Sequence, residues 1–265
     1  MNSFRPEVPV ALLLGGFDPS GGAGILRDVA VVSGLGIHPM AIPIAETVQN
    51  GFECAEIVSP GLNPMKQLDA LKIHLCGKWG VKLSMFHSCS LLCDVLPQIH
   101  RSKPSAAIWD TVIAPTYGVS LHSTTSIKEV IGLLANNNWV VSPNIPEARL
   151  LADLPHGDIE TIAKKLTDIG MQSVWIRGGH GADETVQDLW YDSKGPEWLT
   201  PYDRLDGDPR GTGCTVTSAW LAFRLSGMEP ISAAEAAIQY IRKAWDYLHM
   251  PGNVGRLAFP PRVPS

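Results

Sequence analysis

The sequence has few cysteines, no excess of basic residues and no long apolar run, and each of these features argues against a class of protein. It has only five cysteines in 265 residues, scattered along a chain long enough to fold without disulfides, so we expect free thiols. It has no excess of basic residues, and a net charge of −5 argues against a nucleic-acid-binding surface, which needs clustered Lys and Arg. It also has no apolar run long enough to span a bilayer and no N-terminal basic stretch followed by such a run, so we expect a cytoplasmic protein with no membrane partner.

The two closest cysteines do not predict a metal site. Cys89 and Cys93 are four residues apart in "HSCSLLCDVLPQIH", on one face of a predicted helix. A metal site would need further Cys or His partners, which this neighbourhood barely offers. We therefore expect both thiols to pack in the core, as free cysteines commonly do.

The composition favours one compact domain that covers residues 1–265. Hydrophobic residues make up 45% of the chain and charged residues 18%, which is enough apolar material for a large core. We find no internal repeat, no low-complexity tract and no linker rich in Pro, Ser or Gly.

Short apolar runs alternate with amphipathic segments along the chain, which is typical of βαβ units and a parallel sheet. The sequence therefore predicts an α/β fold with a doubly wound, mostly parallel central sheet, helices on both faces and a short antiparallel ribbon. The ribbon is expected in 184–205, with a turn at "DSKG". Strands are predicted at 8–16, 37–50, 80–86, 106–113, 139–144 and 172–179, and helices at 25–36, 64–76, 90–101, 125–137, 145–153, 158–170, 213–227 and 231–250.

The loop after the first predicted strand could bind an anion. "GGFDPSGGAG" contains Asp18 and five glycines, and in a doubly wound sheet ligands bind beyond the carboxyl ends of the strands. Glycines let a ligand approach backbone N–H groups, and a helix beginning near Ala23 would offer its positive end. The loop matches neither G-x-G-x-x-G nor the P-loop, so a plain tight turn explains it equally well.

Three oxygen-bearing side chains follow later strands and could support Mg²⁺. Asp110 ends one apolar run, and Asn144 and Glu147 stand where another strand passes into a helix. Mg²⁺ is usually held by one or two carboxylates beside substrate phosphates. A helix cap, with Asn144 as N-cap and Glu147 as its N3 partner, is the alternative. Arg177 in "WIRGGH" also follows a strand and suits a phosphate, or a turn.

The segment "RGTGCTVTSAW" is the most specific signal for chemistry. Gly211 and Gly213 would let successive N–H groups form an anion-binding nest, to which the following helix adds its dipole. Cys214 then lies in the first turn of that helix, a place that is expected to lower a thiol pKa and to make it a base or an anion. The alternative is a buried structural cysteine.

The ordered set "DPSGGAGI…D", "QN", "PNIPEA", "GGH" and "GTGCT" resembles the ribokinase-like superfamily, and within it the hydroxymethylpyrimidine/phosphomethylpyrimidine kinases of thiamine biosynthesis. The resemblance extends from about Leu12 to the last helix. It implies transfer of the γ-phosphoryl group of ATP, with Mg²⁺, to the hydroxymethyl group of 4-amino-5-hydroxymethyl-2-methylpyrimidine and then to its monophosphate. Because homodimers are common in this family, the resemblance also implies a homodimer.

The resemblance also implies a role for each matching residue. Cys214 would be the catalytic base or its equivalent, Gln49 and Asp28 would read the polar edge of the pyrimidine, and Met85 and Val112 would cover its ring. The implied sets are an anion hole of Gly211, Thr212, Gly213 and Cys214; a substrate pocket of Gly16, Ala23, Asp28, Gln49, Met85 and Val112; ATP and phosphate contacts from Arg177, Gly178, Asn144 and Asp110; and a metal site of Asp110, Glu147 and Asn144.

Several positions depart from the family pattern, mostly on the phosphate side. The commonly observed Lys, His, Pro, Gly and Lys are replaced by Arg177, Arg210, Thr111, Ser84 and Ala30. Arg177 keeps the charge but has a planar fork in place of a compact ammonium. We therefore expect the pyrimidine specificity to be better retained than the second phosphorylation. Residues 48–60 and 115–123 are candidate lids, because both are predicted as loops that follow strands.

Other functions also fit the pattern. A pyridoxine or pyridoxal kinase would act on a hydroxymethyl group of a similar flat heterocycle, and Gln49 favours the pyrimidine. A non-catalytic pyrimidine-binding relative would explain the altered phosphate side. A sugar kinase is disfavoured, because its base is normally an aspartate where this chain has Cys214.

Overall fold

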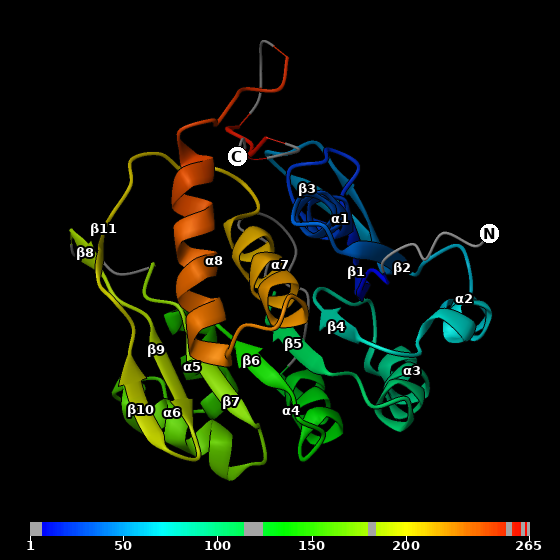
Figure 1. The fold of residues 1–265 in the computed structure, drawn as a ribbon, viewed down its shortest axis with the longest axis horizontal. Coiled ribbons are helices and arrows are strands. Elements are labelled where there is room, and N and C mark those ends of the chain that lie inside the picture. The colour runs from blue at the N-terminus through cyan, green and yellow to red at the C-terminus, as the bar shows by residue number, and fades with distance from the viewer. Residues whose placement is uncertain (1–6, 114–123, 180–183, 253–255, 261–262, 264–265) are drawn as a thin grey trace.

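The computed structural model describes residues 7–113, 124–179, 184–252, 256–260 and 263 (Figure 1). Its centre is a nine-stranded sheet in the order β10-β9-β7-β6-β5-β4-β1-β2-β3. The strands from β2 to β7 in this order pair in parallel, and the antiparallel strands β3, β9 and β10 extend the two edges. The fold is therefore the doubly wound, mostly parallel α/β architecture that the sequence predicts.

Helices cover both faces of the sheet (Figure 1). The core on one face contains buried side chains of α2 to α6, and the core on the other face contains those of α1, α7 and α8. The strands of the main sheet are β1 Val10–Phe17, β2 His38–Gln49, β3 Cys54–Val58, β4 Trp79–Leu83, β5 Ala106–Asp110, β6 Val140–Ser142, β7 Ser173–Ile176, β9 Leu189–Asp192 and β10 Gly195–Trp198. The helices are α1 Gly24–Gly34, α2 Pro64–Leu71, η1 Lys72–His74, α3 Cys89–Arg101, α4 Thr124–Leu134, α5 Ile145–Ala152, α6 Ile159–Asp168, α7 Thr212–Leu225 and α8 Pro230–Trp245.

The chemistry of the sequence explains where these elements begin and what they bury. The central strands β4 and β5 are buried at every position, as continuous apolar runs with helices on both faces must be. Among the described residues, four side chains that begin a helix accept a backbone N–H hydrogen bond: Asn63, Ser88, Asn144 and Asp158. α7 is buried nearly all round, because it lies between the sheet, α1 and α8.

The antiparallel ribbon is also confirmed, and the structure adds a second pair. β9 and β10 form a hairpin that turns at residues 193–194 and joins the sheet through β7. Outside it, β8 Thr185–Val186 pairs with β11 Tyr202–Asp203 as a separate two-stranded sheet. In the part of the chain that the structure describes, no helix is long and apolar enough to cross a membrane.

Three expectations need correction. The candidate lid at 48–60 is not simply a loop, because Cys54–Val58 forms the edge strand β3 against β2. The helix predicted at 64–76 ends at Leu71 and continues only as a short 3₁₀ turn. None of the five cysteines forms a disulfide, and Cys93 is exposed while Cys89 is buried, because four residues advance a helix by about 40° beyond a full turn. The other candidate lid, 115–123, lies outside the described residues.

Candidate active site

The predicted site residues converge where the parallel strands end. Gly16 lies near the end of β1, Gln49 ends β2, Met85 follows β4, Asp110 ends β5 and Arg177 follows β7. These strands run in the same direction, so their carboxyl ends meet along one border of the sheet, the carboxyl edge. The start of α7 lies at the same edge, so its first turn is placed among side chains from distant parts of the sequence.

The first turn of α7 contacts both sides of this edge. Gly211 has φ +77°, and a Cβ there would overlap the carbonyl oxygen of Gly22 in the loop after β1. A Cβ on Gly213 would lie 2.6 Å from Nη1 of Arg177 and 3.4 Å from Oδ1 of Asp110. Glycine is therefore required at 211, where the contact is with backbone, whereas at 213 the contact is with the end of the flexible Arg177 side chain. Since a helix cannot satisfy its own first N–H groups, those of residues 212–214 are available to an anion between the two sides.

Cys214 is buried at the centre of this turn, and its predicted acidity is wrong. Burial raises the pKa of the thiol to about 12, although the Lys82 ammonium opposes the shift. The N–H of Gly24, the first residue of α1, donates a hydrogen bond to the sulfur. The sequence indicated the helix terminus that would lower the pKa, but it did not show how completely α1, α7 and the sheet would remove the thiol from water.

A buried ammonium behind Cys214 was missed by the sequence analysis. The side chain of Lys82 on β4 is fully buried. Its Nζ donates to Oδ1 of Asp28 (2.6 Å), to the carbonyl oxygen of Cys214 (3.1 Å) and to Oγ of Ser218 (3.1 Å), and it lies 3.4 Å from Oδ2 of Asp110. Burial lowers the pKa of Lys82, but the charges of Asp28 and Asp110 outweigh it and raise that pKa overall. Lys82 therefore stays charged. A lysine within an apolar strand was the available signal.

Asp28 is placed differently from the prediction that it reads the substrate edge. Its side chain is 1% exposed, and Oδ1 accepts hydrogen bonds from both Lys82 and Ser218 (2.9 Å). The carboxylate therefore connects α1 to β4 and α7. This arrangement gives Asp28 a structural role beneath the predicted pocket.

Of the other predicted pocket residues, Gly16, Ala23 and Met85 lie around the end of β1, and Val112 follows β5. A Cβ on Gly16 would overlap Cε of Met85, so these two residues are in direct contact. Ala23 caps α1 and donates its N–H to Oδ2 of Asp18 at 3.0 Å. Ala23, Met85 and Val112 are half-buried, as residues that line a pocket would be.

Gln49 is held at both ends of its amide. Its Nε2 donates to Oγ1 of Thr47 (2.8 Å), and its Oε1 accepts from Arg210 (2.8 Å). The Arg210 guanidinium also donates to Oδ2 of Asp18 (3.1 Å) and to Oγ of Ser20 (3.0 Å). Arg210 thus connects the segment before α7 to the glycine loop and to the end of β2.

On the phosphate side, Asp110 and Arg177 form the centre of a charged cluster. Nη2 of Arg177 donates to Oδ1 of Asp110 (3.1 Å) and to the carbonyl of Ser142 (2.8 Å). Oδ2 of Asp110 accepts from the hydroxyl of Thr217 (3.0 Å). Oε2 of Glu147 lies 3.8 Å from the same Arg177 nitrogen. One guanidinium is therefore placed between two carboxylates at the edge of the sheet.

Asn144 and Glu147 form the helix cap that the sequence offered as an alternative. Oδ1 of Asn144 accepts from the N–H of Glu147, and Oε2 of Glu147 accepts from the N–H of Asn144, both at 2.9 Å. Glu147 also accepts from the hydroxyl of Thr111 at 2.9 Å. Burial raises the pKa of Glu147, although Arg177 opposes the shift. The cap does not displace Glu147 from the cluster, because the same carboxylate faces Arg177.

A cavity of about 370 Å³ opens beside this cluster. Four predicted residues line it: Asn144, Arg177, Thr212 and Gly213. The sequence analysis did not identify its apolar and aromatic wall, which comes from β8, β11, α7 and α8 and cannot be recognised without the fold. That wall consists of Val186, Tyr202, Val216, Ile238, Ile241 and Trp245. Gly178 is not among the lining residues, and its N–H already donates to Oδ1 of Asp188 (2.8 Å).

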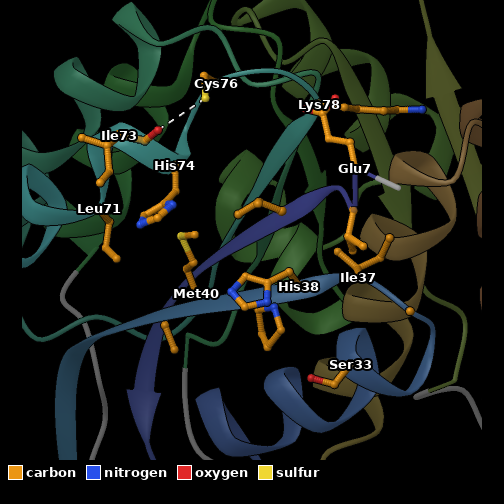
Figure 2. Close-up of a pocket in the computed structure, with 15 residues that line it drawn as sticks. Glu7, Ser33, Ile37, His38, Met40, Leu71, Ile73, His74, Cys76 and Lys78 are labelled. Atoms are coloured by element: carbon orange, nitrogen blue, oxygen red, sulfur yellow. Dashed lines mark hydrogen bonds between the residues drawn. The ribbon is translucent and has the colours of Figure 1, made fainter. Parts of the chain in front are cut away.

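A second, larger hollow lies at the other ends of the parallel strands, where β1, β2 and β4 begin (Figure 2). Its volume is about 900 Å³, and its lining includes His38, Met40, His74 and Cys76. Of the predicted site residues, all of which the structure describes, none lines this hollow. In the described ranges, no group of three or more His, Cys, Asp or Glu side chains could hold a metal ion.

Comparison with known proteins gives one family and one fold. A family model described as phosphomethylpyrimidine kinase matches residues 18–260. The hydroxymethylpyrimidine/phosphomethylpyrimidine kinase of Aquifex aeolicus is 31% identical over 241 residues, which cover 89% of this chain and 93% of that protein. The pyridoxal kinase of Staphylococcus aureus in complex with AMP-PCP has a TM-score of 0.84 at 22% identity and covers 97% of this chain and 95% of its own. The phosphomethylpyrimidine kinase of Clostridium difficile has a TM-score of 0.75 at 23% identity, with 90% and 100% covered. The structural likenesses confirm the ribokinase-like fold.

Proposed function

We propose a function for this chain from its family, since it belongs to the phosphomethylpyrimidine kinases. It transfers the γ-phosphoryl group of ATP to 4-amino-5-hydroxymethyl-2-methylpyrimidine and then to the resulting monophosphate. Both steps serve thiamine biosynthesis. The observation that carries this proposal is the position of the first turn of α7. Gly211 contacts the loop after β1, and Gly213 contacts Arg177. The N–H groups of this turn therefore lie between the proposed pyrimidine pocket and the charged cluster, where a phosphoryl group in transfer needs stabilisation.

The nucleotide is proposed to occupy the cavity beside the cluster. The apolar and aromatic side chains of its wall suit an adenine ring, and Arg177, Thr212 and Gly213 suit the phosphates. The pyrimidine is proposed to occupy the opposite side, near Gly16, Gln49 and Met85. This division places the two substrates on either side of Cys214.

Cys214 is proposed to take the proton of the substrate hydroxyl. The hydroxyl oxygen bonds to the γ-phosphorus, the bond from that phosphorus to the bridging oxygen breaks, and ADP leaves with the electron pair. The proton passes to the sulfur, so the reactive form is the thiolate. Because burial holds the pKa near 12, this form is a minor fraction at neutral pH.

Asp110 and Glu147 fit a magnesium ion that arrives with the nucleotide. Their two carboxylates lie against Arg177, which lines the cavity, and such a set matches the preference of Mg²⁺ for one or two carboxylates plus phosphates and water. When bound, the ion would neutralise phosphate charge. Arg177 is already placed between the two carboxylates and would contribute its charge to the same phosphates.

A coupled assay of ADP release tests this function with the pyrimidine, its monophosphate and pyridoxal. We expect turnover of both pyrimidines, with kcat/KM for the alcohol at least about tenfold above that for pyridoxal. Turnover of pyridoxal alone would make the protein a pyridoxal kinase. Pyrimidine binding seen by calorimetry without ADP release would make it a non-catalytic binding protein.

A further inference from the structure

Arg210 is anchored by its backbone before its side chain enters the site. Its N–H donates to the carbonyl of Leu257 (3.0 Å), and Arg210 forms a β-bridge with Ala258. Its side chain is 16% exposed and passes close to the glycine loop, where a Cβ on Gly22 would lie 3.4 Å from Cβ of Arg210. The guanidinium is thus brought to Gln49 from a backbone that the C-terminal segment holds in place.

The hydrogen bonds at the two ends of the Gln49 side chain allow only one orientation of its amide. The Thr47 hydroxyl donates to the carbonyl of Phe17 (2.9 Å), so its oxygen is left to accept from Nε2 of Gln49. At the other end Arg210 can only donate, so it must meet Oε1. Rotation of the amide by 180° would oppose two donors at one end and leave the hydroxyl without its donor at the other. The orientation of the amide is therefore determined by both neighbours.

A fixed amide presents one hydrogen-bonding pattern to a ligand. After these contacts, Nε2 keeps one N–H and Oε1 keeps one lone pair. A 4-aminopyrimidine has a ring nitrogen acceptor beside an exocyclic amine donor, which matches this pattern. Pyridoxal has no amine beside its ring nitrogen and cannot offer the same adjacent pair.

We propose that Arg210 is a positioning residue for substrate specificity, which fixes the Gln49 amide so that the site favours an aminopyrimidine over pyridoxal. The inference rests on the proposed function. It assigns Arg210 no contact with the reacting atoms. Its expected effect is on the recognition of the ring, and the nucleotide side should be unaffected, because Arg210 contacts the glycine loop and β2 and not the cavity beside Arg177.

Steady-state kinetics of Arg210→Met and Arg210→Lys test this role, with Arg101→Met as the control. Arg101 is an exposed residue at the end of α3, away from the carboxyl edge. We expect Arg210→Met to raise the KM for the pyrimidine about tenfold, the loss typical of one charged hydrogen bond, and to leave the KM for ATP within about twofold. Arg210→Lys should restore part of the preference for the pyrimidine over pyridoxal.

A double-mutant cycle separates this role from support of the glycine loop. Because Arg210 acts through Gln49, Arg210→Met should change the pyrimidine preference little when Gln49→Ala is already present. Thr47→Val, which releases the other end of the amide, should lower the preference for the pyrimidine over pyridoxal as Arg210→Met does.

An unchanged preference for the pyrimidine in a folded, active Arg210→Met variant would overturn the inference, as would full additivity of Arg210→Met with Gln49→Ala. If the wild type turns over neither pyrimidine, the proposed function fails, and this inference fails with it.

Discussion

At the scale of single residues, Cys214 shows two opposing effects on one thiol. Two helix N-termini and the Lys82 ammonium favour the thiolate, and burial disfavours it. Burial is the larger effect, so the pKa is raised to about 12. The sequence identifies the residue, but the sign of its pKa shift depends on how deeply the fold buries it.

This raised pKa predicts a pH-dependent rate. Below the pKa the thiolate fraction falls tenfold for each pH unit, so the log of kcat should rise with a slope near one between about pH 7.5 and 9. Cys214→Ala should lose this slope. Cys93→Ala, at an exposed thiol of α3, should keep it. A flat profile for the wild type would show that the Cys214 thiolate is not the base.

Lys82 is the second residue whose environment the sequence does not show. It neutralises Asp28, which would otherwise be an uncompensated charge in the core, and it shares Asp110 with Arg177. Removing one partner of a buried ion pair is costly because the other charge stays buried.

We therefore predict that Lys82→Met lowers the free energy of unfolding in urea by about 3–5 kcal/mol. Lys72→Met, which breaks an exposed pair with Asp69, should cost less than about 1 kcal/mol. Adding Asp28→Asn to Lys82→Met should recover part of the loss, because it removes the unpaired carboxylate. Equal stabilities of the two lysine variants would contradict this reading of the core.

At the scale of elements, the alternation of apolar runs predicts most strands and helices, because each buried strand and amphipathic helix has its own local pattern. The elements that the local pattern does not predict correctly depend on contacts with other parts of the fold. β3 is an exposed edge strand whose only local signal is its proximity to β2, and α2 stops before the residues that its pattern would include. The apolar wall of the cavity was missed for the same reason, since Tyr202 and Ile238 come to line one cavity only when the chain folds.

The start of α7 predicts a difference between two glycines with positive φ. Gly211 (φ +77°) contacts Gly22, whereas a Cβ on Gly36 (φ +81°) would meet open space. Alanine at either position should cost about 1–2 kcal/mol for the left-handed conformation. Gly211→Ala should cost more and lower kcat by roughly 100-fold, because the anion-binding turn must shift away from Gly22.

Thermal unfolding and kcat measured for both alanine variants check this prediction. Gly36→Ala should keep the wild-type kcat, since Gly36 lies at the opposite edge, between α1 and β2. Equal losses of stability together with an unchanged kcat in Gly211→Ala would contradict the close contact at the start of α7.

At the scale of the whole molecule, the strand order explains why one short segment can serve two substrates. The proposed pyrimidine contacts Gly16, Gln49 and Met85 lie on or just after β1, β2 and β4, which are neighbours in one half of the sheet. The phosphate contacts lie at or after the ends of β5, β6 and β7 in the other half, and Val112 follows β5 at the boundary. α7 packs over the strands at the boundary and begins between the two sets. We propose that the phosphoryl group passes across this boundary at Cys214.

The transfer of label from γ-³²P-ATP to the pyrimidine alcohol is the direct test of this phosphoryl transfer. The wild type should form labelled pyrimidine monophosphate and then the diphosphate, and Cys214→Ala should form them about 10²–10⁴-fold more slowly while remaining folded. Absence of labelled pyrimidine with the wild type, or formation at the wild-type rate by Cys214→Ala, would contradict the account.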